Sequence, residues 1–200
     1  NPEKWNLMYG FSGGLQLALN SRRENYVEAD SIYRKFFFDS SIGVALPLGA
    51  SEMMHSSGTS YQMALGIWFN PIVGARLGIN VQTMQNSTGT VDVLGAKMRR
   101  SYAMALGGAR AELMLNPLNF ISSWRNREGG NDFEVNMLVG ADLGCITKSG
   151  GSFKGDRLRM YYGWTSAMQF LYRINSPGTY IFVEPRVMSA KYNSLYGNTG

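Results

Sequence analysis

The feature that most constrains this chain is a strict alternation of apolar residues with small or polar ones, sustained over segments of roughly 10 to 15 residues. In the first segment, aromatic and aliphatic residues occupy most odd positions from Trp5 to Leu19, and mainly small or polar residues occupy the even positions. Because successive side chains of a β-strand point to opposite faces, each such segment predicts a strand with one apolar and one polar face.

Eight segments carry this pattern. They are residues 5–19, 36–48, 60–70, 73–84, 101–116, 132–147, 160–174 and 179–189. Each reaches or nearly reaches the roughly 9–11 residues of a transmembrane strand, whereas strands of soluble proteins average about 5–6. Within 101–116 the alternation changes phase, and a β-bulge at Gly107-Gly108 would reconcile the two halves. We therefore expect one all-β domain over residues 1–200, an antiparallel up-and-down transmembrane β-barrel.

Composition agrees with a barrel and excludes several other classes. No run of 18 apolar residues occurs, so no transmembrane helix is expected. A mean hydropathy of −0.16 fits barrel strands, since only alternate residues face lipid. The single Cys145 excludes an internal disulfide and a cysteine-based zinc site. A net charge of +5, without a basic helix or a long Lys/Arg run, argues against nucleic acid as a partner.

The joins between segments alternate in length. Those at 70–72 and 175–178 are short and contain Asn and Pro, whereas 20–35, 49–60, 85–100 and 148–159 are longer and polar. Outer-membrane barrels have short periplasmic turns and longer extracellular loops. The join that opens at Asn116-Pro117 also begins with turn residues, but it is a longer connection that ends at Gly129-Gly130-Asn131.

Ionisable residues in the segments all lie on the non-aromatic face. A barrel of about eight strands has an interior just wide enough for its side chains, so we expect these residues to form a lumen ion-pair network: Asp39, Arg76, Arg110, Glu112, Glu134, Asp142, Arg173, Glu184 and Arg186. In a soluble sandwich the same charges would form the solvated face. Aromatic residues such as Tyr61, Phe69 and Tyr162 lie toward segment ends. The aromatic girdles of membrane barrels have this placement, so it favours a barrel whose apolar face meets lipid over a soluble sandwich.

Three stretches resemble the OmpA-type outer-membrane barrels of Bacteroidota-like anaerobes. They are residues 68–77 (WFNPIVGARL), 112–120 (ELMLNPLNF) and 180–186 (YIFVEPR). That family usually has Asp where this chain has Glu112, a change that keeps the charge. The resemblance implies a β-barrel in the bacterial outer membrane. It does not extend to a peptidoglycan-binding domain.

The sequence offers little for catalysis. The only histidine, His55, lies in a polar join among Ser and Met residues, and a Ser–His–acid arrangement would need it as the base. No cluster of His, Cys or carboxylates has the spacing of metal ligands. We expect no enzyme activity, no cofactor and no metal.

The expected function is a structural or assembly component of the cell envelope with a filled lumen. Six large residues are predicted to point inward: Trp68, Met114, Leu138, Tyr180, Phe182 and Met188. A pore or transporter for small solutes is the first alternative, and a soluble lipid-binding barrel the second. The expected partners are outer-membrane lipid, lipopolysaccharide, and other outer-membrane or periplasmic proteins.

Basic residues of two joins are predicted to contact lipopolysaccharide, because Lys and Arg form charge-assisted hydrogen bonds with phosphate. They are Lys97, Arg99, Arg100, Lys148, Lys154, Arg157 and Arg159. Solvated surface charge is the alternative interpretation of the same residues.

The joins also predict an unfinished barrel. If the short joins are periplasmic, Asn1 lies at the extracellular end of its strand, whereas such barrels begin and end in the periplasm. We therefore expect at least one further strand before Asn1 and one after Gly200, giving an even total of ten or more. Alternatively, residues 5–19 are a lumenal or periplasmic segment and the barrel begins near Lys35.

Overall fold

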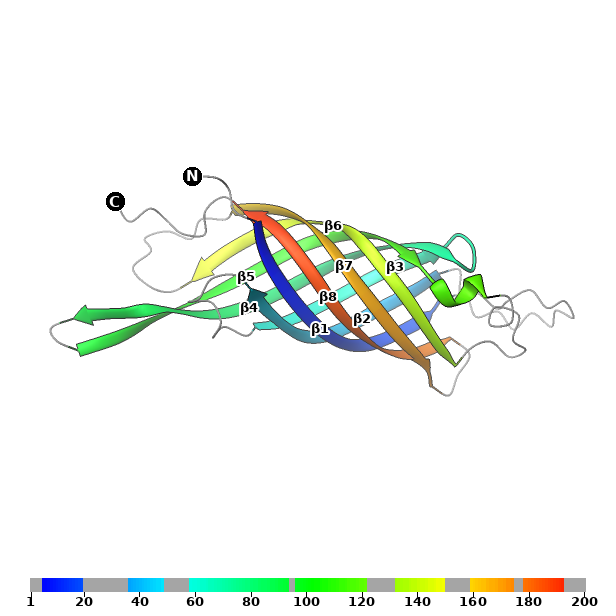
Figure 1. Cartoon of the computed structure of the whole chain (residues 1–200), viewed down its shortest axis with the longest axis horizontal. Coiled ribbons are helices and arrows are strands. Elements are labelled where there is room, and N and C mark those ends of the chain that lie inside the picture. Colours follow the sequence, from blue (N-terminus) through cyan, green and yellow to red (C-terminus); the bar gives the residue numbers. More distant parts are fainter. Residues whose placement is uncertain are drawn as a thin grey trace, which may run out of the picture.

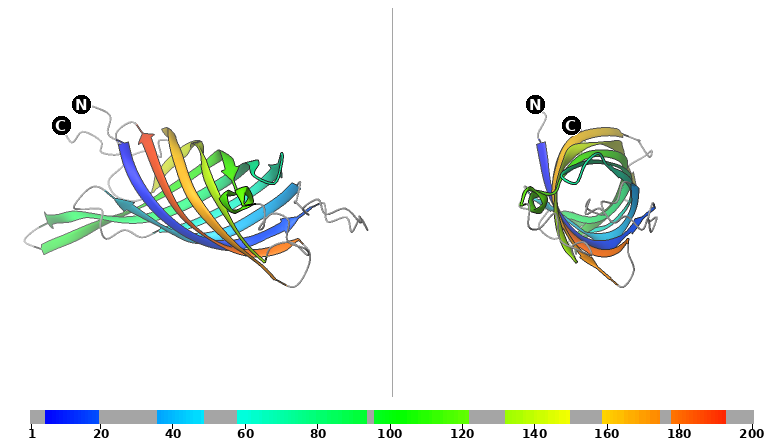
Figure 2. Two further views of the ribbon diagram at one scale, coloured as in Figure 1. Left: turned by 45° about the vertical axis from the view of Figure 1, so that its right-hand side comes forward. Right: turned by 90° about the vertical axis from the view of Figure 1, so that its right-hand side faces the viewer.

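The computed structural model describes residues 5–19, 36–48, 58–93, 96–121, 132–149, 159–174 and 178–192. Eight antiparallel strands close into a barrel, each paired with its neighbours in sequence (Figure 1). They are β1 (Trp5–Ala18), β2 (Phe36–Leu48), β3 (Gly58–Trp68), β4 (Val73–Val93), β5 (Ala96–Leu115), β6 (Phe133–Ser149), β7 (Arg159–Arg173) and β8 (Thr179–Tyr192). The expected all-β, antiparallel, eight-stranded architecture is confirmed, and the end-on view in Figure 2 shows the closed ring.

The expectation that the barrel needs further strands is wrong. β1 and β8 pair directly, in continuous register from Trp5 opposite Lys191 to Leu17 opposite Thr179. An open barrel would leave one edge of each strand with unpaired N–H and C=O groups, and this pairing satisfies both edges. Closure also rules out the alternative in which residues 5–19 stand apart from the wall.

Both ends of the described chain lie at the same end of the barrel, because an even number of antiparallel strands returns to its starting side (Figure 1). We call this the terminal end. The opposite end, which we call the turn end, contains the joins β1–β2, β3–β4, β5–β6 and β7–β8. The expectation of missing strands depended on placing the turn end in the periplasm. Because β1 and β8 pair directly, no further strand is needed to close the barrel.

Asparagine side chains shape the joins at the turn end. Asn70 Oδ1 accepts hydrogen bonds from the backbone N–H groups of Ile72 (2.8 Å) and Val73 (2.7 Å), so the β3–β4 turn is held by its own first residue. Asn116 precedes a short 3-10 helix, η1 (Pro117–Phe120), and its side chain accepts from the Asn119 N–H. The Asn119 amide then donates to the Pro71 carbonyl at 2.7 Å, which ties the two joins together. Among the described residues, no helix is long and apolar enough to cross a membrane.

β4 and β5 continue well beyond the barrel wall as a two-stranded ribbon (Figure 1). β3 leaves β4 at Met84 and β6 leaves β5 at Ala103, but β4 and β5 stay paired as far as Val93 and Ala96. Both strands thus run past the expected segments 73–84 and 101–116. The ladder is irregular between Thr88 and Thr90.

The expected bulge at Gly107-Gly108 is wrong. β5 pairs with β4 and β6 in unbroken register through both glycines. The phase of the sequence pattern changes instead because Leu106 is an apolar residue inside the lumen. Leu106 therefore lies on the opposite face of β5 from Leu113.

Candidate functional site: the wall and the lumen

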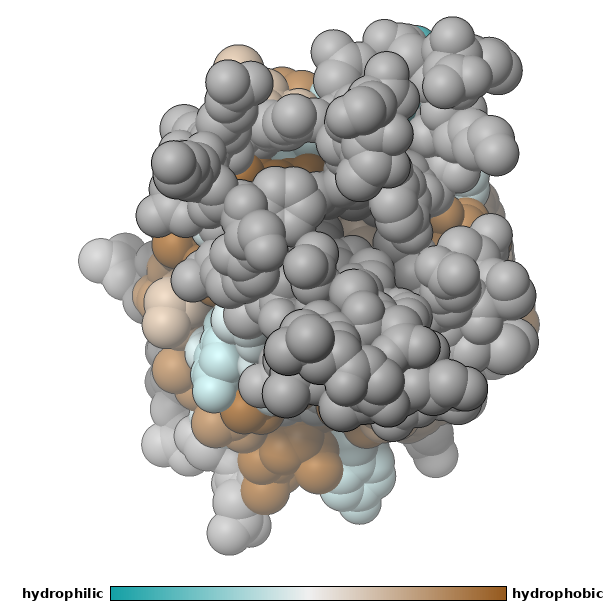
Figure 3. All heavy atoms as spheres, turned by 90° about the vertical axis from the view of Figure 1, so that its left-hand side faces the viewer, coloured by the Kyte–Doolittle hydropathy of each residue, from teal (hydrophilic) through white to brown (hydrophobic). Residues whose placement is uncertain are grey.

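The outer wall of the barrel is apolar on every strand. Large exposed apolar side chains include Phe11 on β1, Ile42 on β2, Leu65 on β3, Leu77 on β4 and Val139 on β6. Among outward strand positions whose side chains the structure describes, Lys191 near the end of β8 is the single charged residue. Figure 3, viewed from the terminal end, shows apolar side chains at several places around the rim of the wall, with small polar patches between them. A strand face in contact with water would carry charges instead.

Outward aromatic residues lie in two bands separated by aliphatic side chains. Tyr9, Tyr61, Tyr162 and Trp164 lie toward the terminal end. Phe36, Phe69, Phe133 and Tyr172 lie toward the turn end. On β7 the two bands are roughly ten residues apart, or about 33 Å at about 3.3 Å per residue. At a strand tilt of about 40°, the apolar zone is about 25 Å tall.

The lumen holds seven buried charges. They are the carboxylates of Asp39, Glu112, Asp142 and Glu184 and the guanidinium groups of Arg76, Arg110 and Arg186. Several pairs join strands that are not neighbours in the sheet, so the contacts cross the barrel interior. Buried charges need partners of opposite sign, because burial removes their hydration.

Arg76 on β4 is the centre of this cluster. Its guanidinium donates to Asp39 at 2.8 Å, to Glu112 at 2.6 Å and to Glu184 at 3.1 Å. These carboxylates come from β2, β5 and β8. One arginine therefore connects four strands through the lumen.

Arg186 on β8 supplies the second cation. It donates to both Glu184 and Glu112, and also to the Thr165 hydroxyl at 2.6 Å. Glu112 and Glu184 thus lie between Arg76 and Arg186, with each carboxylate bonded to both cations. The arrangement is a closed ring of alternating charges.

Arg110 and Asp142 form a separate pair nearer the terminal end. Arg110 donates to Asp142 Oδ2 through both Nε (2.9 Å) and Nη2 (2.6 Å), so one carboxylate oxygen accepts two charge-assisted hydrogen bonds. Its Nη1 donates to Gln62 at 2.8 Å. The Tyr161 hydroxyl donates to the other Asp142 oxygen at 2.9 Å. The four groups fix each other's positions.

Apolar layers lie on both sides of the charges. Toward the turn end are Phe37, Trp68, Met114, Leu138 and Ala167, followed by Leu171, Tyr180 and Phe182. Toward the terminal end are Met8, Ala45, Leu106, Ile146, Tyr161, Met188 and Ala190. All six large residues expected to point inward are buried. The lumen is therefore filled along its length.

Two of the nine residues expected in the network lie apart from the cluster. Arg173 donates to Asp132 at 2.6 Å at the turn end, where the two side chains are 24% and 71% exposed. Glu134 is half-buried near the start of β6. Both occupy inward positions, but too close to the strand ends to reach the central carboxylates and arginines.

Sequence reasoning missed the polar partners of the cluster. Gln62, Thr165 and Gln169 each bond a lumen charge. All three lie on inward positions, so the alternation itself could have identified them. It does not indicate which inward residues meet across the barrel, because that depends on strand register.

The remaining candidates have limited structural context. Of the basic residues expected to contact lipopolysaccharide, Lys154 and Arg157 lie outside the described residues. For Lys97, Arg99, Arg100, Lys148 and Arg159 the structure describes the strand backbone at or beyond the terminal end, but not the side chain. His55 also lies outside the described residues, and Cys145 is a half-buried residue of β6. Within the described part of the chain, no three His, Cys, Asp or Glu side chains gather to hold a metal.

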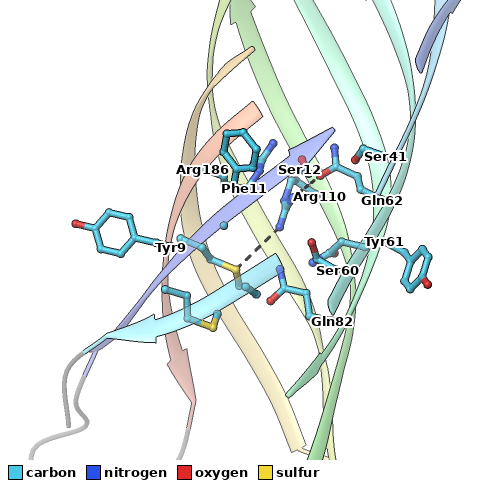
Figure 4. A pocket seen from close by; sticks show the side chains of 15 residues that line it. Tyr9, Phe11, Ser12, Ser41, Ser60, Tyr61, Gln62, Gln82, Arg110 and Arg186 are labelled. Carbon is cyan, nitrogen blue, oxygen red and sulfur yellow. Dashed lines mark hydrogen bonds between the residues drawn. The ribbon is translucent and has the colours of Figure 1, made fainter. Parts of the chain in front are cut away.

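A small cavity lies in the terminal half of the lumen, beside Arg110 and Arg186 (Figure 4). Its volume is about 30 Å³. Serines from β1, β2 and β3 and the amides of Gln62 and Gln82 line it, whereas the rings of Tyr9 and Tyr61 point away.

Comparison with known proteins adds no family to this description. No protein-family model matches the chain. No curated protein has a significant match to its sequence.

Proposed function

We propose that this chain is a transmembrane β-barrel of a bacterial outer membrane, acting as a structural or assembly component of the cell envelope. The observation that carries the proposal is the polarity of the barrel. Its outer wall is apolar on all eight strands, and seven buried charges lie inside as ion pairs. This is the reverse of a soluble barrel, and it is the arrangement that a lipid surrounding requires.

The height of the apolar zone supports the same proposal. At the usual tilt of barrel strands, the separation of the two aromatic bands corresponds to about 25 Å, which is compatible with the apolar band of outer-membrane barrels. The resemblance of residues 68–77, 112–120 and 180–186 to OmpA-type barrels points the same way. Within the first of these stretches, the Asn70 side chain accepts a hydrogen bond from the Ile72 N–H and so holds the β3–β4 turn.

The filled lumen favours a structural role over transport. The ring of Arg76, Glu112, Glu184 and Arg186 crosses the interior, and apolar layers lie on either side of it. In planar bilayers we expect no stable current, and an open-channel conductance on the nanosiemens scale would favour the pore alternative. A soluble lipid carrier needs a cavity large enough for an acyl chain, and the cavity beside Arg110, at about 30 Å³, is too small for one.

Membrane insertion is tested by placing a charge on the wall. Leu77 lies outward on β4 and is 65% exposed, so Leu77→Arg has no packing to disrupt. In lipid vesicles we expect this variant to lose about 2–4 kcal/mol of stability, the cost of an arginine near the bilayer midplane. Thr147→Arg, outward but near the end of β6, is the control and should lose about 0–1 kcal/mol. Equal stability of Leu77→Arg and wild type would contradict a lipid-facing wall.

The proposed contacts of this component are with lipopolysaccharide and with other envelope proteins. Lys97, Arg99 and Arg100 belong to the ribbon, and Lys148 and Arg159 lie at the same end of the barrel. Neutralising Arg99, Arg100, Arg157 and Arg159 together should reduce the lipopolysaccharide that co-purifies. Unchanged retention would count against this contact while leaving membrane insertion untouched.

A further inference from the structure

We infer that η1 and the residue that follows it, Ile121, form a lipid contact outside the strands, in the headgroup region of the bilayer at the turn end. We call residues 117–121 the η1 segment. The inference rests on the proposed function, because it needs a bilayer around the wall. The end-on view in Figure 2 shows η1 beside the ring of strands and not over its opening. No residue of η1 is buried, and Phe120 and Ile121 are 63% and 54% exposed.

Two hydrogen bonds fix the η1 segment to the neighbouring β3–β4 turn. The Asn116 N–H donates to the Ile72 carbonyl at 2.8 Å, and the Asn119 side-chain amide donates to the Pro71 carbonyl at 2.7 Å. Both acceptors lie between the end of β3 and the start of β4. The η1 segment is therefore held at one position on the barrel, although the Phe120 side chain is exposed.

The surface that the segment presents is apolar and carries no charge. From Leu113 to Trp124 the sequence contains no ionisable residue. Exposed apolar surface of this kind marks a contact with a membrane or with another protein. The choice between these two partners depends on where the segment lies.

Its position favours lipid over a protein partner. Phe69, just before the β3–β4 turn, is exposed and belongs to the turn-end band of aromatic residues. Because η1 is bonded to that same turn, Phe120 and Ile121 extend the band away from the wall. The aromatic bands of membrane barrels lie at the level of the lipid headgroups, so an extension of the band meets lipid at that level.

Depth-dependent fluorescence quenching tests the contact in the full chain, refolded into phosphatidylcholine vesicles. In a Cys145→Ser background, Phe120→Cys carries an environment-sensitive fluorophore, and the lipids carry a nitroxide either near the headgroup or near the end of the acyl chain. We expect the shallow nitroxide to quench this label more strongly than the deep one. Ile121→Cys should give the same result, and it serves as the test if the Phe120 variant does not refold.

Two labelled positions are the controls. Leu77→Cys lies on the outer wall of β4, so the deep nitroxide should quench it more strongly than the shallow one. Asp132→Cys lies at the turn end, where the Asp132 side chain is 71% exposed and pairs with Arg173, and neither nitroxide should quench it appreciably. Quenching at Leu77 with none at Phe120 or Ile121 overturns the lipid contact of the η1 segment and leaves the proposed function in place. Absence of quenching at all four positions overturns both.

Discussion

At the scale of the residue, Arg76 carries the largest electrostatic role in the lumen. It is the common partner of Asp39, Glu112 and Glu184, and all four side chains are buried. Arg76→Met keeps much of the side-chain volume but removes the arginine that pairs with Asp39, and it leaves Glu112 and Glu184 paired with Arg186 alone. Removing one partner of a buried ion pair costs about 3–5 kcal/mol, so we expect at least this loss in the free energy of unfolding, measured by urea titration in detergent micelles.

The matched control at this scale is Arg173→Met. Arg173 also pairs with a carboxylate at 2.6 Å, but Asp132 is mostly exposed, so water replaces the lost contact. Exposed ion pairs contribute about 0–1 kcal/mol. Similar losses for Arg76→Met and Arg173→Met would mean that the lumen cluster is hydrated and not buried.

At the scale of the element, β2 and β3 pack through a large residue opposite a glycine. Phe37 and Gly66 are partners in the β2–β3 register, and a Cβ on Gly66 would overlap the Phe37 ring. Phe37 also contacts Trp68, with ring centroids 6.4 Å apart, so it cannot move freely. We expect Gly66→Ala to lose about 1–3 kcal/mol, the usual cost of overpacking, measured by the same titration.

The control for this pair is an outward glycine of β5. An added Cβ on Gly107 meets nothing within 4 Å. Gly107→Ala should therefore leave stability unchanged or raise it by up to about 1 kcal/mol, because alanine restricts the unfolded chain. A loss for Gly107→Ala as large as that for Gly66→Ala would contradict steric overlap as the cause.

The elements were largely predictable from the sequence, because alternation reports directly which face of a strand is apolar. Of the nine charged residues that the alternation assigned to the lumen, seven are buried there. The ribbon beyond Met84 and Ala103 was not predictable, since it lies beyond the closed part of the barrel and has no interior to impose a pattern. Leu106 was misleading for a related reason, because an apolar residue fits either the apolar outer wall or an apolar layer inside the lumen.

At the scale of the whole molecule, closure depends on the contact between the first and last strands. Alternation indicates which face of β1 and β8 is apolar, but not which other strands each of them pairs with. Their pairing is therefore a property of register and strand number, not of local pattern. The larger barrel was expected from the lengths of the joins, and these lengths do not report that β1 and β8 pair with each other.

The β1–β8 register makes closure testable by cross-linking. Leu15 and Ile181 are outward partners in this register. Directly opposed residues of antiparallel strands have Cα atoms about 4.5–5.5 Å apart, which is within the range that a disulfide can bridge. In a Cys145→Ser background, cysteines at Leu15 and Ile181 should oxidise to a disulfide in the folded barrel, detected by altered mobility on non-reducing gels. Cysteines at Leu15 and Val183, two residues out of register, should not. If neither pair forms a bond, β1 and β8 do not meet, and an open barrel with further strands becomes the better description.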